Sequence, residues 1–170
     1  GQTDVGGLIG ADTGSVVTSS EVMSSGTGSI KGVVTSQNQT IQNIGGLIGH
    51  ANGTTIDNSN VSVVMDITDG SATTIMNVGG MIGYGEGITV SPTSPSSTGR
   101  ESSVNSMMMV GATGTATVQG IGGAIGKLDL SPDFGSSSVS MLDMNGSMSV
   151  GGVNVRSVGG AVGQSAYASI

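Results

Sequence analysis

The sequence predicts an all-β protein, a parallel β-solenoid (β-helix) of four to five repeats of about 34–43 residues. The first observation is a phrase with three glycines that occurs five times: VGGLIG at 5–10, IGGLIG at 44–49, VGGMIG at 78–83, IGGAIG at 121–126 and VGGAVG at 158–163. The second is that β-branched residues alternate with Ser and Thr between the phrases, which favours short strands over helices.

The composition supports an ordered repeat protein. The chain has 32 Gly among 170 residues but only three Pro, and its mean hydropathy is positive at +0.20, unlike a disordered segment. It has two Tyr, one Phe and no Trp. We therefore expect a narrow core of stacked aliphatic side chains. Because the chain begins with Gly1, we expect a processed form or an excised part of a longer protein.

Each repeat reads as about three short strands. The phrase is followed by a turn and then by a Ser-rich alternating stretch, in four versions at 20–23, 59–63, 103–105 and 138–141. A polar turn such as Asp69-Gly70 or Asn145-Gly146 precedes a last strand, at 40–43, 74–77, 117–120 and 154–157. One unit cannot bury its apolar side alone, so we expect residues 1–170 to form one domain with repeats starting near 5, 44, 78, 121 and 158.

The spacing between the third and fourth phrases is the longest. Residues 85–100, which include SPTSPSSTG, read as an inserted loop that accounts for it.

Strand alternation predicts two faces for the phrase. Val5, Gly7 and Ile9 would lie on one face, and Gly6, Leu8 and Gly10 on the other. The Ile9 position reads Ile, Ile, Ile, Ile, Val in the five copies, which predicts a β-branched column in the core. Two explanations of the glycines stay open: close approach of another backbone, or tight corners.

The phrase and the residues after it resemble the GLUG motif. The second unit, IGGLIGHANGTTIDNSNVSV at 44–63, is most similar to it. The chain departs from the motif where Tyr is common, and has instead Val22, Val61, Val104 and Val139. The resemblance implies an extracellular, β-rich repeat region of the kind found in large secreted bacterial adhesins and in the stalks of IgA-specific peptidases.

Charge and residue types exclude several function classes. The net charge is −7 with four Lys and Arg, so a nucleic-acid partner is not expected. No apolar run is long enough for membrane insertion. With no Cys and His50 as the single histidine, we expect no catalytic residues, no metal site and no cofactor. The absence of Cys also fits an extracellular or cell-surface location.

Two pairs of carboxylates are candidate sites. Asp66 with Asp69 is the best candidate for Ca²⁺, and this pair and Asp129 with Asp133 are the candidates for polysaccharide cleavage. Both pairs sit near expected turns, where Asp favours local hydrogen bonds, so solvated turns are the alternative. The aromatic residues Tyr84, Phe134 and Tyr167 are too scattered for a sugar platform.

Surface modification and ice binding are further alternatives. Four Asn-X-Ser/Thr sequons place possible glycosylation at Asn38, Asn52, Asn60 and Asn145. Threonines at 54–55, 73–74 and 113, 115 and 117 hint at an ice-binding array, but they do not repeat at one place in every unit.

The two ends of the predicted solenoid are similar to each other. Both expose phrase edges without an obvious cap, and such edges invite head-to-tail stacking into open filaments. The expected self-assembly edges are Val5, Gly6, Gly7, Leu8 and Ile9 at one end and Val158, Gly159, Gly160, Ala161 and Val162 at the other. We therefore expect a structural filament subunit or stalk that forms a homopolymer. The alternative is a non-polymerising adhesin or phage-fibre segment that binds a surface ligand or glycan.

Overall fold

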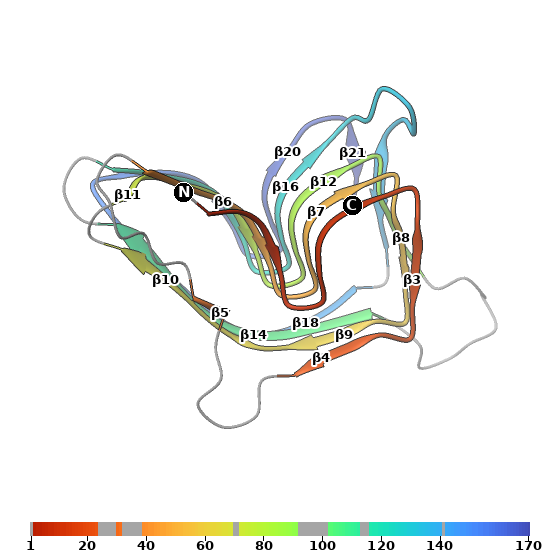
Figure 1. Ribbon diagram of the computed structural model, residues 1–170, viewed down its shortest axis with the longest axis horizontal. Coiled ribbons are helices and arrows are strands. Elements are labelled where there is room, and N and C mark those ends of the chain that lie inside the picture. Colours follow the sequence, from red (N-terminus) through yellow and green to blue (C-terminus); the bar gives the residue numbers. More distant parts are fainter. Residues whose placement is uncertain are drawn as a thin grey trace.

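The chain coils through four parallel sheets. The computed structural model describes residues 2–23, 30–31, 39–69, 72–91, 102–112, 116–140 and 142–170. These residues form strands joined by turns and contain no helix. Each coil passes through sheets A, B, C and D in turn and then steps up by one strand (Figure 1). The predicted parallel β-solenoid is confirmed.

Every strand of a sheet comes from a different coil, apart from sheet D, where some coils supply two strands. Sheet A contains β1 (Gln2–Gly6), β6 (Gln39–Gly45), β11 (Ala72–Gly79), β15 (Thr117–Gly122) and β19 (Asn154–Gly159). Sheet B contains β2 (Ile9–Thr13), β7 (Ile48–Asn52), β12 (Ile82–Glu86), β16 (Ile125–Asp129) and β20 (Val162–Ser165). Sheet C contains β3 (Val16–Thr18), β8 (Thr55–Asp57), β13 (Thr89–Val90), β17 (Ser137–Val139) and β21 (Ala168–Ser169). Sheet D contains β4 (Glu21–Met23), β5 (Ile30–Lys31), β9 (Asn60–Ser62), β10 (Val64–Asp69), β14 (Ser102–Ala112) and β18 (Leu142–Gly151).

The five phrases stack in register. The residue that begins each phrase pairs with its counterpart in the next coil, in the order Val5, Ile44, Val78, Ile121, Val158. The repeat spacing therefore corresponds to one complete coil. The expectation of three strands per unit was wrong, because each phrase is divided between two strands of different sheets.

The division of the phrase also changes which side chains face inward. In the second coil β6 ends at Gly45 and β7 begins at Ile48, with a bend between them. Both Leu47 and Ile48 are fully buried, and Met81 and Ile82 repeat this in the third coil. The predicted column at the Ile9 position is confirmed by Ile48, Ile82 and Ile125, but the strict alternation of faces was wrong because the chain turns within the phrase.

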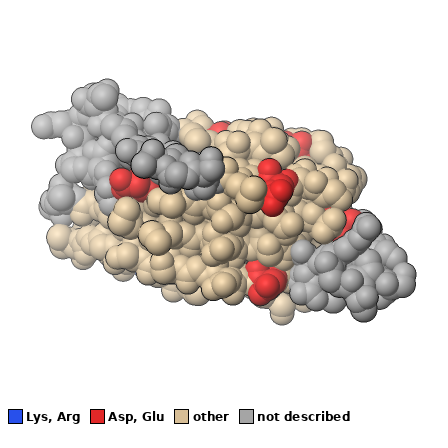
Figure 2. All heavy atoms as spheres, turned by 90° about the horizontal axis from the view of Figure 1, so that it is seen from below, with Lys and Arg blue, Asp and Glu red and all other residues tan. Residues whose placement is uncertain are grey.

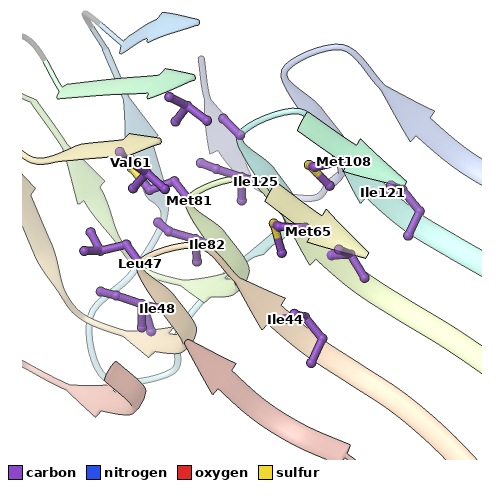
Figure 3. Close-up of a cluster of buried hydrophobic side chains, with 14 of the residues drawn as sticks. Ile44, Leu47, Ile48, Val61, Met65, Met81, Ile82, Met108, Ile121 and Ile125 are labelled. Carbon is purple, nitrogen blue, oxygen red and sulfur yellow. The ribbon is translucent and has the colours of Figure 1, made fainter. Parts of the chain in front are cut away.

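The bend carries the phrase into the middle of the coil. Figure 1 shows the link between β6 and β7 pointing inward, toward the strands of sheet D. Figure 3 shows the resulting core, in which Leu47 and Met81 lie among the stacked isoleucines and near Val61 from sheet D. The cross-section is thus narrow, and aliphatic side chains fill it without aromatic rings.

Each glycine of the phrase has its own steric reason. In the second coil, a Cβ on Gly45 would collide with the carbonyl oxygen of Ile48 in the same turn. A Cβ on Gly46 would collide with the carbonyl of Gly80 one coil further on, and would lie 2.6 Å from Cγ1 of Val61. A Cβ on Gly49 would lie 2.5 Å from backbone atoms of β1. Both explanations of the glycines therefore apply: Gly45 permits a tight corner, and Gly46 and Gly49 permit the close approach of a neighbouring backbone.

A polar ladder precedes the phrase in sheet A. The amide of Asn77 donates to Oδ1 of Asn43 at 2.8 Å, and the amide of Asn43 donates to Oδ1 of Asp4 at 2.8 Å. All three residues have positive φ, as do Gly120 and Ser157 at the same position of the later coils. Asn, Asp and Gly adopt this left-handed conformation at the lowest cost, and the two hydrogen bonds link these residues directly before the first three phrases.

Three sequence assignments are corrected. The predicted loop at 85–100 begins too early, because Gly85 and Glu86 end β12 and β13 follows, while residues 92–101 lie outside the described part. Val139 pairs with Val90 in sheet C, so the counterpart of Val104 in sheet D is Met144. The expected turn at Asn145-Gly146 lies inside β18, because this coil crosses sheet D as one long strand.

Candidate functional site: the end faces of the solenoid

The solenoid ends in two sets of edge strands. Strands β1, β2, β3 and β4 lie at one end, here called the N face, and β19, β20 and β21 lie at the other, the C face. The predicted edge residues lie on these strands or in the bends between them: Val5 and Gly6 in β1, Ile9 in β2, Val158 and Gly159 in β19, Val162 in β20, and Gly7, Leu8, Gly160 and Ala161 in the bends. Among the described strands, none pairs with the outer edge of either face.

The end faces carry most of the exposed large apolar side chains of the described residues. Eight of the twelve belong to the first or last coil: Leu8, Val16 and Met23 on the N face, and Val153, Val155, Val158, Tyr167 and Ile170 toward the C face. Leu8 is 54% exposed, whereas its counterpart Leu47 is fully buried. Val155 and Val158 likewise pair with the fully buried Val118 and Ile121, so at these positions the ends present core side chains to solvent. Val16 and Met23 pair with partly exposed residues and point away from the core.

The two faces differ in charge. The N face carries the carboxylates of Asp4, Asp12 and Glu21 on β1, β2 and β4. Lys31 on β5, the other first-coil strand of sheet D, is a cation at the same end, so the carboxylates are in excess. Arg156 lies on β19 at the C face, in the column that begins with Thr3. An acidic face and a face with a cation are electrostatically complementary.

Sheet D is shorter by one strand at the C face. Its last strand, β18, belongs to the fourth coil, whereas β19, β20 and β21 add a fifth strand to the other sheets. A cavity of about 200 Å³ opens beside β18, lined by Val104, Ser106, Met108, Gly123, Met144, Asn145, Gly146, Ser147, Met148 and Gly160. The Ser106 hydroxyl is buried there without a hydrogen-bond partner among the described residues.

A second group of functional side chains lies on the outer side of sheet B. The rings of His50 and Tyr84 stack with centroids 5.0 Å apart, and Nζ of Lys127 lies 4.9 Å from the centre of the Tyr84 ring. Lys127 also pairs with Asp129 at 3.0 Å. The three residues His50, Tyr84 and Lys127 occupy the same register position in successive coils. The sequence analysis did not predict this column, because His, Tyr and Lys are different residue types and do not form a recognisable repeat. The one available signal was that each of them directly follows a phrase.

Charge and burial shift the pKa values of Tyr84 and of Asp129, the ion-pair partner of Lys127. Burial, together with a hydrogen bond to Glu86 and the charges of Glu86 and Asp129, raises the pKa of the Tyr84 phenol well above its ordinary value. The backbone N–H of Leu130 and the ammonium of Lys127 lower the pKa of Asp129. Tyr84 is thus held as a neutral phenol, and the column ties three neighbouring coils together.

The predicted carboxylate pairs lie on strands and in one loop. Asp66 lies within β10, which ends at Asp69. Asp129 ends β16 and pairs with Lys127, while Asp133 lies exposed in the following loop. Among the described residues, no group of three or more His, Cys, Asp or Glu could hold a metal ion. Figure 2, which views the molecule from the side of sheet D, shows separate acidic groups on a largely uncharged surface.

The sequons and threonines are distributed over different surfaces. Asn52 accepts a hydrogen bond from Ser131 and Asn60 accepts one from Ser103, whereas Asn145 is exposed on β18. Asn38 lies outside the described residues, as do Thr113 and Thr115. Thr54 is buried and donates to Asp12.

The one phenylalanine closes a corner of the solenoid. Phe134 lies in the loop after β16 and packs against Gly14 and Gly53, which occupy the turn between sheets B and C in the first two coils. Its ring therefore packs against these two turns, while the residue as a whole stays 47% exposed.

No protein-family model matches the chain, and no significant match is found to a curated protein or to a solved structure. The described residues include no helix that could span a membrane.

Proposed function

We propose that this chain is a structural block of an extracellular stalk or filament, whose coils continue the same end-to-end stacking beyond both faces. The observation that carries the proposal is that the N face and the C face present the same phrase in the same register with unpaired strand edges. A residue that is fully buried in the middle coils is half exposed at an end, as Leu47 and Leu8 demonstrate. Continued stacking would bury it.

The physical reason is the cost of an open edge. Unpaired N–H and C=O groups beside exposed apolar side chains are a template for further strands. Burying one Leu, Val or Ile side chain contributes about 1.5–3 kcal/mol. Several such positions on each face make an isolated block much less favourable than a continued stack.

An extracellular location is proposed on the composition and on the resemblance to the GLUG motif. Zero Cys and low charge fit a secreted repeat protein, and secreted adhesins and peptidase stalks contain similar repeats. A structural role also fits the placement of Asp66 and Asp69 within a strand and of Asp129 in an ion pair with Lys127.

Negative-stain electron microscopy of the purified chain across a concentration series tests the proposal. We expect long fibres of uniform width whose length grows with concentration, because each added block buries one pair of faces. Discrete short particles at every concentration would contradict a filament-forming role. They would direct attention to surface ligands, as in an adhesin segment.

A further inference from the structure

We infer that the C face binds the N face of a second copy of this chain, in the register that already joins neighbouring coils. The inference rests on the proposed function and adds the partner, the register and the contacts. In this register Val158 would pair with Val5 of the next copy, Val162 with Ile9, and Gln164 with Ala11. These pairs extend the order of pairing that runs from β1 to β19 and from β2 to β20.

The glycines give the first reason for this register. In each of the first four phrases, a Cβ on the second glycine would collide with the carbonyl oxygen of the second glycine one coil further on, as with Gly80 and Gly123. The fifth phrase has the same glycine, Gly160, although a Cβ there would meet nothing within 4 Å. Nothing within the described chain requires glycine at this position. The carbonyl of Gly7 in a second copy would require it.

The polar ladder gives the second reason. Asn77 donates to Asn43, and Asn43 donates to one carboxylate oxygen of Asp4, so the ladder ends at the N face with an acceptor. Toward the C face the hydrogen bonds stop at Asn77, because Gly120 in the next coil has no side chain. Ser157 occupies the same position in the last coil, with the same positive φ, and is exposed. In the stacked register the Ser157 hydroxyl would donate to the remaining oxygen of Asp4 in the next copy. The C face thus offers a hydroxyl donor at this position, and the N face offers a carboxylate acceptor.

Charge and shape give the third reason. Arg156 on the C face would lie against Thr3 of the next copy, beside Asp4, so a cation meets the acidic face. Leu8, 54% exposed on the N face, would lie over Ala161 as Leu47 lies over Leu8 within the chain. Sheets A, B and C would carry this junction, because sheet D stops one strand short of the C face.

Gly160→Ala tests the junction without disturbing the isolated chain. Because the added Cβ has open space in the free chain, we expect unchanged thermal unfolding in dilute solution. In assembly it would strike the Gly7 carbonyl of the second copy. We expect the concentration needed for polymer formation, measured by sedimentation velocity, to rise roughly tenfold or more, which corresponds to about 1.4 kcal/mol per junction.

A charge exchange tests the ladder contact. Ser157→Asp would place two carboxylates against each other across the junction, so we expect assembly to be lost. Adding Asp4→Asn should restore it, because an Asn amide at position 4 can accept from Asn43 and donate to the carboxylate introduced at position 157. Asn43 accepts and donates in the same way within the chain. Failure of the double variant to recover assembly would contradict this contact.

Cysteine pairs test the register directly, since the chain contains no Cys. Ala11 and Gln164 are both exposed on sheet B, and neighbouring strands place Cα atoms about 4.8 Å apart, within the range of a disulfide. Oxidation of A11C/Q164C should give a ladder of covalent multimers. The control A11C/S169C, with its second Cys on sheet C, should give no ladder.

The outcomes separate the two proposals. If the unmodified chain stays monomeric in sedimentation and microscopy, the filament-forming role fails and the junction fails with it. If it forms polymers that Gly160→Ala leaves intact and A11C/Q164C does not cross-link, the filament stands and this junction is overturned.

Discussion

The middle phrases and the end phrases have nearly the same sequence but different surroundings. Leu47 in the second coil is fully buried and Leu8 in the first is 54% exposed, while Ile121 in the fourth is fully buried and Val158 in the fifth is 43% exposed. The difference arises because a middle coil has a neighbouring coil on both sides, whereas an end coil has one on a single side. Burial in a solenoid is therefore decided by neighbours along the axis, and a phrase that is buried in a middle coil is exposed where the stack stops.

The largest predicted difference in stability is between two Gly→Ala variants at the same phrase position, one in the third coil and one in the fifth. Gly80→Ala should destabilise the fold by more than about 4 kcal/mol, because its Cβ would strike the Gly123 carbonyl and lie 2.7 Å from Cγ1 of Val104. Gly160→Ala should leave stability unchanged. Urea unfolding of both variants below the assembly concentration measures this, and equal losses would refute the steric account of the phrase.

The next contrast is between two leucines of the same phrase position. Leu47→Ala should cost about 2–5 kcal/mol, since it leaves a cavity in the core. Leu8→Ala should cost under about 1 kcal/mol in the isolated chain, because the side chain is already half exposed. Chemical denaturation compares the two, and a loss at Leu8 as large as at Leu47 would indicate that the N face is covered.

The polar ladder gives a smaller effect. Asn43→Ala should cost about 2–3 kcal/mol, because it removes two hydrogen bonds and places Ala at a φ of 55°. Asn43→Gly is the matched control: it loses the same bonds but keeps the backbone conformation, as Gly120 does in the fourth coil. We expect thermal unfolding to place the glycine variant between the alanine variant and the unmodified chain.

The smallest effect concerns pH. The folded pKa of Asp129 lies below its ordinary value, so its contribution to stability is present above the unfolded pKa and is lost as the pH falls through the folded one. Asp129→Asn should therefore cost a few tenths of a kcal/mol at about pH 7 and nothing in strong acid, since the pair with Lys127 is partly exposed. Urea unfolding at both pH values measures this, and a cost that persists in acid would assign the effect to packing.

The sequence predicted the repeat and two of the four strand positions, because these depend on period and alternation. That one repeat makes one coil follows from the register of sheet A. It missed sheet C, whose strands have two or three residues and no pattern of their own. It missed the inward bend, because alternation was extended through Gly46 where the chain turns. The polar ladder could have been predicted in part. The position before each phrase is Asp, Asn, Asn, Gly and Ser in the five copies, and all five residues have positive φ in the structure. The stacking of His50 on Tyr84 could not be predicted without the register between β7 and β12.

Hydrogen–deuterium exchange of the end strands tests the central claim most directly. In a dilute solution of the unassembled chain, the backbone amides of β11 in the middle should exchange slowly, and those of β1 and β19 at the ends should exchange fast. In assembled material we expect β1 and β19 to become as protected as β11. If the end strands exchange fast in the assembled state as well, the end faces do not bind each other, and the account of this chain as a stacking block is wrong.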